Sequence, residues 1–346
     1  MAEKKEINNK EGNGLTGLKN LGNTCFMNAT LQCLSFTHEL NNFFDKETYK
    51  NRLNNVSDSV ILYEWDNLRK LMWSEDCTIS PGGFFSAIRK VAQLKDRVIF
   101  TGFAQNDLTE FLNFLIDCFH EAIKREVQMD ITGIPQSNTD KLAINCYQMY
   151  MRMYSKEYSE ILNLFYRIHV SKLEFKDGSY QSTSPEPFLN LNLPIPNKKT
   201  VSLYDCFDEY VKKETLDEDN MVINEKSGNK ETCTKELLFF SLPNILVIIL
   251  KRFNNNNKKI NKNIDIPLAN LNLNKYLIGY EKNGIYDLYG ICNHMGTSTG
   301  GHYTAHVKAK NNKWYNFDDT RVKEINEKNL ISEYSYCLFY RKKKLN

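Results

Sequence analysis

The sequence predicts an α+β fold in which helices come first along the chain and an antiparallel sheet follows. In the first half, apolar residues recur at helical spacing over long stretches. After about Phe165 the pattern changes to short β-like runs, which Gly, Pro, Ser and Asn clusters separate. No internal repeat is visible, so the fold is not a repeat array.

Three helices are expected in the first half. The first runs from Asn23 to about Phe44, where either Thr24 or Asn23 is available as the N-cap. The others are expected at Val60 to Trp73 and at Asn106 to about Val127. In the last of these, the apolar stripe consists of Leu108, Phe111, Leu112, Leu115, Ile116 and Phe119.

The strands expected in the second half are the runs RIHVSKLEF, FLNLNLPIP and ILVIILKRF. One helix, around Leu203 to Lys213, interrupts them, and the polar stretch from Asp217 to Thr234 is expected to form an exposed loop or a hairpin. The longest apolar run, Ile245 to Leu250, is far too short for a membrane span and suits a buried strand.

Composition narrows the classes of function. The 346-residue chain has 45 basic and 42 acidic residues and a formal net charge of +3, so we expect neither nucleic-acid binding nor attachment to an anionic membrane. Residues 1–13 are polar and lack the apolar core of a signal peptide, which predicts a disordered tail and an intracellular protein, cytoplasmic or nuclear.

The nine cysteines are scattered singly, without the spacing of a disulfide framework, and this favours a reducing compartment. No Cys-x-x-Cys pair occurs, and the six histidines do not cluster with cysteines. We therefore expect no metal site and no cofactor.

Cys25 is the candidate nucleophile. The predicted helix places it in the first turn, where unpaired amide groups lower the pKa of a thiol. Asn20 and the turn at Leu21, Gly22 and Asn23 precede it and offer donors for an oxyanion.

His302 is the candidate base. It follows Gly300 and Gly301 in GTSTGGHYTAHVKAKNNKWYNFDD, which has the pattern of a hairpin with its turn near Lys310. Such a hairpin places Asp318 roughly opposite His302, where it would hold the imidazole tautomer. The two glycines permit another backbone to approach closely, as a substrate tail of small residues would.

GLKNLGNTCFMNATLQCL at residues 17–34 and GGHYTAHV with the downstream KWYNFDD closely resemble the Cys and His boxes of the ubiquitin-specific proteases. FAQNDLTEFLNFLID at residues 103–117 resembles the Gln-Gln-Asp box of that family. LPNILVIILKRF and SYCLFYRKK fit it as well. The matches extend over nearly the whole chain, in the order that the family has.

This resemblance implies a papain-like cysteine protease of right-hand architecture, built as one catalytic domain over residues 14–343. It would have a helical thumb at about 14–160, β-fingers at about 161–236 and a palm at about 237–343. Cys25, His302 and Asp318 would be the catalytic residues, while Asn20 and Asp319 would support the oxyanion. Residues expected to contact the ubiquitin tail are Asp107, Phe253, Gly300, Gly301 and Tyr303.

The sequence departs from the family at two places. Where many members have the Cys-x-x-Cys pairs of a zinc ribbon, this chain has VSKLEF and NEKSGNKETC, so we expect that no zinc is bound. Asn106 and Leu108 flank Asp107 where Gln and a small residue are common, which leaves the acid in place and changes its surroundings.

The resulting hypothesis is a monomeric deubiquitinase that hydrolyses the bond after the C-terminal glycine of ubiquitin, with ubiquitin and ubiquitinated proteins as its partners. Three alternatives stay open: a protease for a ubiquitin-like modifier, a non-catalytic ubiquitin-binding scaffold, and a general papain-like peptidase.

Overall fold

The computed structural model describes residues 12–175 and 181–344, and its chain divides into two compact units. Unit 1 comprises the residues up to Ile123 together with Asn255–Lys259 and Tyr289–Tyr336. Unit 2 comprises Lys124–Asn254, Ile260–Leu288 and the residues from Cys337 onwards. This division follows different boundaries from the predicted thumb, fingers and palm, so the single-domain organisation stays a prediction.

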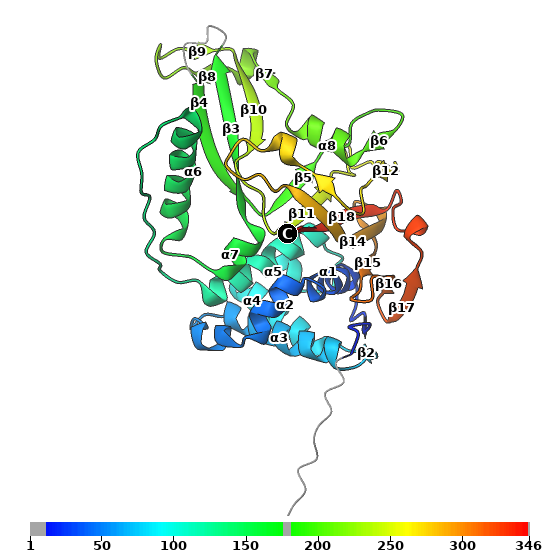
Figure 1. Ribbon diagram of the computed structural model, residues 1–346. Coiled ribbons are helices and arrows are strands. Elements are labelled where there is room, and N and C mark those ends of the chain that lie inside the picture. Colours follow the sequence, from blue (N-terminus) through cyan, green and yellow to red (C-terminus); the bar gives the residue numbers. More distant parts are fainter. Residues whose placement is uncertain (1–11, 176–180, 345–346) are drawn as a thin grey trace, which may run out of the picture. The chain divides into compact units, whose positions relative to one another are not determined.

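Unit 1 contains most of the helices that the first half of the sequence predicts (Figure 1). Its helices are α1 (Cys25–Ser35), α2 (His38–Asp45), η1 (Thr48–Arg52), α3 (Asp58–Ser74), α4 (Gly82–Leu94), η2 (Val98–Phe100), α5 (Leu108–Ile123) and η5 (Glu327–Asn329). Sequence patterns gave no prediction for α4, which begins with two glycines.

The first predicted helix is in fact two helices, α1 and α2, which are separated at Phe36 and Thr37. The Thr37 hydroxyl hydrogen bonds with the Cys33 carbonyl oxygen at 3.2 Å and with the Tyr289 hydroxyl at 2.7 Å. Threonine side chains that bond to nearby backbone groups favour helix boundaries over helix interiors. The hydrogen bonds of the Thr37 side chain therefore favour an end of α1 at Ser35, although the apolar pattern continues to about Phe44.

The apolar stripe predicted for α5 is confirmed, because all six of its residues are fully buried. Phe119 shows how the stripe packs. Its ring lies 6.2 Å from that of Phe44 in α2 and 6.1 Å from that of Trp65 in α3. The aromatic contacts of α5 therefore join three helices into one core.

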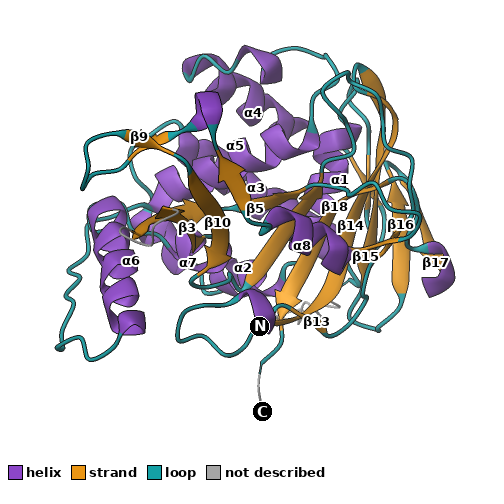
Figure 2. Cartoon of the chain, turned by 90° about the horizontal axis from the view of Figure 1, so that it is seen from above, coloured by secondary structure: helices purple, strands orange, loops and turns teal. Residues whose placement is uncertain are grey.

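The strands of unit 1 form two sheets. The strands are β1 (Gly17–Leu18), β2 (Thr78–Ile79), β15 (Gly300–Lys308), β16 (Trp314–Asp318) and β17 (Arg321–Ile325), together with the later part of β14 (Ile285–Thr297). The larger sheet has the order β17-β16-β15-β14 with antiparallel pairing, whereas β1 pairs with β2 in parallel. Helix α1 packs against β15 and β16 (Figure 2).

Unit 2 carries the remaining helices and strands. They are α6 (Asn138–Tyr154), α7 (Glu160–Phe165), β3 (Arg167–Phe175), β4 (Gln181–Phe188), β5 (Asn190–Leu193), β6 (Val201–Ser202), α8 (Leu203–Tyr210), β7 (Glu214–Leu216), η3 (Glu218–Asn220), β8 (Val222–Ile223), β9 (Lys230–Glu231), β10 (Cys233–Phe239), β11 (Ile245–Leu250), β12 (Ile264–Asp265), β13 (Leu271–Asn272), η4 (Asn274–Tyr276), and most of β18 (Ser335–Lys342).

One sheet of unit 2 has the order β4-β3-β10-β7, and α6 packs along β4 (Figure 1). The contacts beneath α6 are apolar and include Cys146, Met149 and Val170. Two stretches correspond to those where the family often has zinc ligands. VSKLEF lies on β3, and NEKSGNKETC leads into β10 and ends at its first residue, Cys233. These two strands pair in antiparallel register, and part of the sequence that joins β3 to β4 lies outside the described residues.

Strand β11 is buried at all six positions, as the apolar run predicted. It pairs with β18 on one side and with β5 on the other. A central strand with both faces covered needs continuous rather than alternating apolar residues. The predicted helix near Leu203 is confirmed as α8, and the polar stretch after it contains the β8–β9 hairpin.

The chain is anchored from the first described residues. Gly12 N donates to the Trp73 carbonyl oxygen, and the Asn13 side chain donates to Asp76 at 2.7 Å. Residues 1–11, which make up most of the predicted tail, lie outside the described residues. Within the described ranges, no helix has both the length and the apolar character that a membrane span requires.

Replacing Phe119 with Ala tests the helical core of unit 1. We expect unfolding to become easier by about 3–5 kcal/mol, because the substitution removes a fully buried ring and leaves a cavity between three helices. Denaturant unfolding followed by tryptophan fluorescence measures the change. As a control, Val98→Ala removes methyl groups from a side chain that is 75% exposed and should change stability by less than about 0.5 kcal/mol. Equal effects of the two substitutions would contradict this account.

Candidate active site

Cys25 is the first residue of α1, in agreement with its predicted place in a first helical turn, and it is 4% exposed. Thr24, one of the two predicted candidates, occupies the N-cap position, although its side chain makes no cap hydrogen bond. The Thr24 hydroxyl instead accepts from Leu21 N at 2.8 Å, and Asn23 donates to the Phe103 carbonyl oxygen. The Thr24 side chain therefore does not occupy the first-turn amides of α1 next to Cys25.

His302 lies on β15 and Asp318 at the end of β16, and the two strands pair directly. Their pairing is shifted by two residues from the predicted one, since Ala305 pairs with Phe317, so His302 and Asp318 are diagonal rather than opposite. Even so, His302 Nε2 lies 2.7 Å from Asp318 Oδ1. The Cys25 side chain lies close enough to the imidazole to raise its pKa, so the three predicted catalytic side chains are neighbours in one group.

This arrangement raises the pKa of His302 to about 9. The main cause is the contact with the Cys25 side chain. Partial burial acts in the opposite direction, and the hydrogen bond with Asp318 adds to the rise. At neutral pH the ring is therefore an imidazolium, which is the form that can donate a proton to a leaving group.

Asn20 is exposed and lies just before the turn that leads into α1. Its Oδ1 accepts from Gly22 N at 3.1 Å and from Thr24 N at 3.0 Å. Its Nδ2 donates to Asp319 Oδ2 at 3.0 Å. An amide nitrogen has two hydrogens, so this side chain retains one N–H that it can direct to an oxyanion.

Asp319 lies in the tight turn between β16 and β17, where its φ is +50°. One ligand atom each of His302, Asp318 and Asp319 lie within 4.8 Å of one another, which is a spacing that a metal ion could bridge. The hydrogen bonds of these groups point to a different use. Asp318 bonds to His302, and Asp319 accepts from Asn20 and also from Asn28.

The glycines before His302 are in close contact with other parts of unit 1. A Cβ on Gly301 would lie 2.3 Å from the Met295 carbonyl oxygen, and one on Gly300 would lie 2.5 Å from Gln105 Oε1. Gln105 also accepts a hydrogen bond from Gly301 N at 2.7 Å. These contacts are within the protein, so the approach of a substrate tail to the two glycines stays a prediction, and the sequence gave no prediction for Gln105.

Asp107 begins helix α5 and also holds two tyrosines. Its Oδ1 accepts from Thr109 N at 2.8 Å, as an N-cap does, and its Oδ2 accepts from the Tyr336 hydroxyl at 2.9 Å. The Tyr303 hydroxyl lies 3.5 Å from the same oxygen. Two of the predicted tail-binding residues, Asp107 and Tyr303, are therefore neighbours. Phe253 belongs to unit 2, and its place beside the cleft stays a prediction.

His294 was not predicted as a site residue, although β14 places it opposite Tyr303 in the pairing with β15. The two rings lie 4.6 Å apart. Burial, and to a lesser extent the charge of Lys259, lower the pKa of His294 to about 4. Two histidines on adjacent strands therefore carry opposite protonation states at neutral pH, a difference that depends on burial and that the sequence pattern does not reveal.

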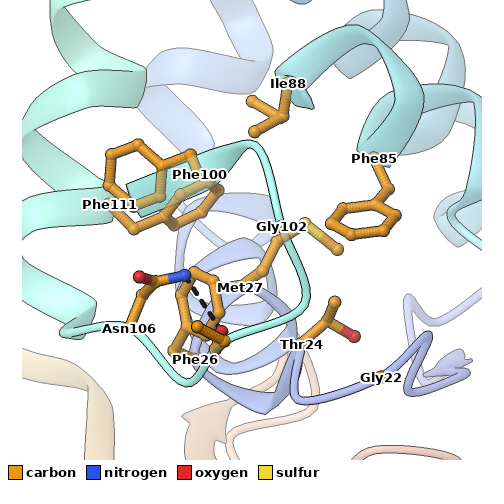
Figure 3. Close-up of a pocket in the computed structure, with 11 residues that line it drawn as sticks. Gly22, Thr24, Phe26, Met27, Phe85, Ile88, Phe100, Gly102, Asn106 and Phe111 are labelled. Carbon is orange, nitrogen blue, oxygen red and sulfur yellow. Dashed lines mark hydrogen bonds between the residues drawn. The ribbon is translucent and has the colours of Figure 1, made fainter. Parts of the chain in front are cut away.

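A small pocket lies beside the start of α1 (Figure 3). Aromatic side chains of α1, α4, η2 and α5 line much of it, including Phe26, Phe85, Phe100 and Phe111. On the loop before α5, Asn106 Nδ2 donates to the Ala104 carbonyl oxygen at 3.1 Å. Because the lining is largely apolar, we interpret the pocket as part of the packing that supports the Cys25 turn.

Histidine NMR tests the predicted charge states. We expect the ring signals of His302 to titrate with a midpoint near pH 9 and those of His294 near pH 4. In Cys25→Ala the His302 midpoint should move down towards its ordinary value, because the largest cause of the rise is removed. His294 serves as the internal control and should keep its midpoint. A His302 midpoint that does not change in Cys25→Ala would show that another group causes the shift.

Comparison with known proteins shows the family of the chain. Residues 16–340 match the family model described as ubiquitin carboxyl-terminal hydrolase. The chain is 33% identical over 349 residues to ubiquitin carboxyl-terminal hydrolase 2 of Homo sapiens, covering 96% of this chain and 56% of the relative. It is 35% identical over 342 residues to the relative of the same name from Gallus gallus, covering 94% of this chain and 93% of that one.

Solved structures are similar as well. Ubp8 in the SAGA DUB module, bound to monoubiquitin, has a TM-score of 0.75 at 26% identity, covering 96% of this chain and 70% of that chain. Ubp8 bound to ubiquitin aldehyde has a TM-score of 0.74 at 25% identity, covering 99% and 72%. This likeness confirms the predicted fold class. The chain spans little more than half the length of the human relative, and it belongs to the ubiquitin carboxyl-terminal hydrolase family.

Proposed function

We propose that this chain is a deubiquitinating cysteine protease that hydrolyses the peptide or isopeptide bond after the C-terminal glycine of ubiquitin. The observation that carries the proposal is the connected group of Cys25, His302 and Asp318 in unit 1. Family membership supports the substrate class, as does the similarity to Ubp8 structures with monoubiquitin and with ubiquitin aldehyde.

In the first half of the proposed reaction, the Cys25 thiolate attacks the terminal glycine carbonyl carbon and forms a tetrahedral oxyanion. The His302 imidazolium then donates its proton to the leaving amine, and the C–N bond breaks to leave a thioester on Cys25. Asp318 orients the ring throughout, because it accepts from Nε2 and so directs the other ring nitrogen to the sulfur.

In the second half, neutral His302 takes a proton from water, whose oxygen attacks the thioester carbonyl. The C–S bond breaks, ubiquitin leaves with a free carboxylate, and the thiolate–imidazolium pair is restored. Asn20 and the first-turn amides of α1 are the groups that we propose as donors to both oxyanions. Asp319 fixes the Asn20 side chain from its other side.

Two alternatives differ from this proposal in class. A non-catalytic scaffold has no need of the connected group of nucleophile, base and acid, so that group favours an enzyme. A protease for a ubiquitin-like modifier would use the same chemistry, and the comparisons favour ubiquitin because Ubp8 is solved with it. An intracellular location and a monomeric state stay predictions, and the Ubp8 structures contain Sgf11, Sus1 and Sgf73 as well.

A ubiquitin probe with a C-terminal thiol-reactive group tests the nucleophile. We expect one adduct, mapped to Cys25 by mass spectrometry. We also expect Cys25→Ala to lower turnover of a C-terminal ubiquitin reporter by at least ~10³-fold while it still binds ubiquitin. Cys77→Ala is the matched control, since Cys77 is partly exposed.

The outcomes separate the alternatives. An adduct at another cysteine, with Cys25→Ala active, would reassign the nucleophile. Labelling by a ubiquitin-like probe but not by ubiquitin would indicate a modifier protease. Binding of ubiquitin by the wild-type protein without any adduct or turnover would indicate a scaffold.

Asp107→Asn tests the proposed contact with the basic end of the ubiquitin tail. Asparagine is as good an N-cap as aspartate, so the start of α5 is preserved while the charge is removed. We expect the KM for the reporter to rise about tenfold at unchanged kcat, and to depend less on salt, since one charge-assisted contact is lost. Asp117→Asn on the same helix is the control. A fall in kcat at unchanged KM would argue that Asp107 acts on the catalytic geometry instead.

A further inference from the structure

Asn28 lies on α1 one turn after Cys25, and its side chain is 3% exposed. Its Nδ2 donates to Asp319 Oδ1 at 2.7 Å and also approaches the carbonyl oxygens of Leu18 at 3.3 Å and Lys19 at 3.4 Å. Three acceptors therefore surround this one amide nitrogen. Two of them, Leu18 and Lys19, come directly before Asn20, and the third belongs to the turn between β16 and β17.

The acceptor side of the same amide has no such partners. Asn28 Oδ1 is buried and makes no hydrogen bond with the described residues. A buried acceptor without a partner is unfavourable, so only the nitrogen end of this amide makes favourable contacts. The main contact of Asn28 is therefore the hydrogen bond that its amide nitrogen donates to the Asp319 carboxylate.

Asp319 connects Asn28 to Asn20. Its Oδ1 accepts from Asn28 and its Oδ2 accepts from Asn20, so the two oxygens of one carboxylate face two different amides. The backbone adds a further link, because the Asp319 carbonyl oxygen accepts from Leu18 N at 2.9 Å. The segment that leads to Asn20 is thus attached to the Asp319 turn at both main chain and side chain.

The two ends of this chain of contacts differ in rigidity. Asn28 belongs to a helix in which every residue is buried, whereas Asn20 and Gly22 are exposed. An exposed side chain that must act as a donor needs to be fixed in advance, because preorganisation is the source of oxyanion stabilisation. The buried helix α1 is held in place by its packing, and Asn28 on this helix can therefore fix Asp319 and, through it, Asn20.

We propose that Asn28 is a positioning residue for the oxyanion donor. Through Asp319 it fixes the Asn20 side chain relative to Cys25, and it touches neither the substrate nor the reacting atoms. This inference rests on the proposed function, since it assigns Asn28 to the transition-state step of that reaction.

The test compares Asn28→Ala with wild type on a C-terminal ubiquitin reporter. We expect kcat to fall about tenfold, which is less than the 10²–10³ for loss of a direct oxyanion donor, while KM stays within about twofold. If Asn28→Ala does not fold, Asn28→Ser gives the same comparison, because its hydroxyl is too short to reach Asp319.

Two measurements separate positioning from a general structural role. In an Asn20→Ala background, Asn28→Ala should have no further effect on kcat, because its target is already absent. The rate at which iodoacetamide alkylates Cys25, read by peptide mapping, should be unchanged, because that displacement forms no oxyanion and reports only on the thiolate and its helix.

Gln32→Ala is the matched control. Gln32 is also a buried amide on α1, its Nε2 donates to the Thr16 carbonyl oxygen at 2.8 Å, and its Oε1 likewise has no partner among the described residues. It makes no contact with Asp319 in the described structure. We expect a similar loss of thermal stability from this substitution with kcat unchanged.

Each other outcome overturns the inference. An unchanged kcat in Asn28→Ala, an additive loss in the Asn20→Ala background, slower alkylation of Cys25, or an equal loss in Gln32→Ala would each do so. Wild-type protein that does not turn over the ubiquitin reporter contradicts the proposed function and removes this inference with it. An active wild type with an unaffected Asn28→Ala contradicts the inference alone.

Discussion

The complete burial of helix α1 is the constraint on which the rest of the site depends. All eleven of its residues are buried, and it packs on the strands that carry His302 and lead to Asp318. A helix enclosed in this way cannot rotate or slide without disrupting the core, because protein interiors are close-packed. The position of Cys25 relative to the sheet is therefore set by apolar packing, and the short hydrogen bonds of the site only refine it.

The two halves of the site are stabilised by different means. The base and the acid lie on paired strands, so the sheet ladder fixes the distance between them. The proposed donor Asn20 lies in an exposed segment between β1 and α1, where the Asp319 carboxylate accepts from its Nδ2 and buried Thr24 N donates to its Oδ1. The groups proposed for proton transfer, His302 and Asp318, thus lie on regular strands. The group proposed to stabilise the oxyanion, Asn20, is instead positioned by a few side-chain hydrogen bonds.

Several site features could not have been predicted from local pattern. The hairpin turn was expected near Lys310, and the pairing found is shifted by two residues, which keeps His302 and Asp318 on one face but makes them diagonal instead of opposite. Gln105 and Asn28 stand in stretches of recognisable sequence, yet their partners Gly301 and Asp319 are far away along the chain. Amide side chains have no periodicity or charge that would reveal a distant partner.

The sequence by itself determined the order of helices and strands, the α5 stripe and the buried strand β11, and it supplied Cys25, His302 and Asp318 as the catalytic candidates. These follow from apolar periodicity, which is a local property, or from compact motifs that resemble a family. Tertiary structure alone decided where α1 ends, which residues share Asp319 and why His294 and His302 carry different charges. Those outcomes depend on burial and on contacts between distant segments, and neither is encoded in the neighbouring residues of the chain.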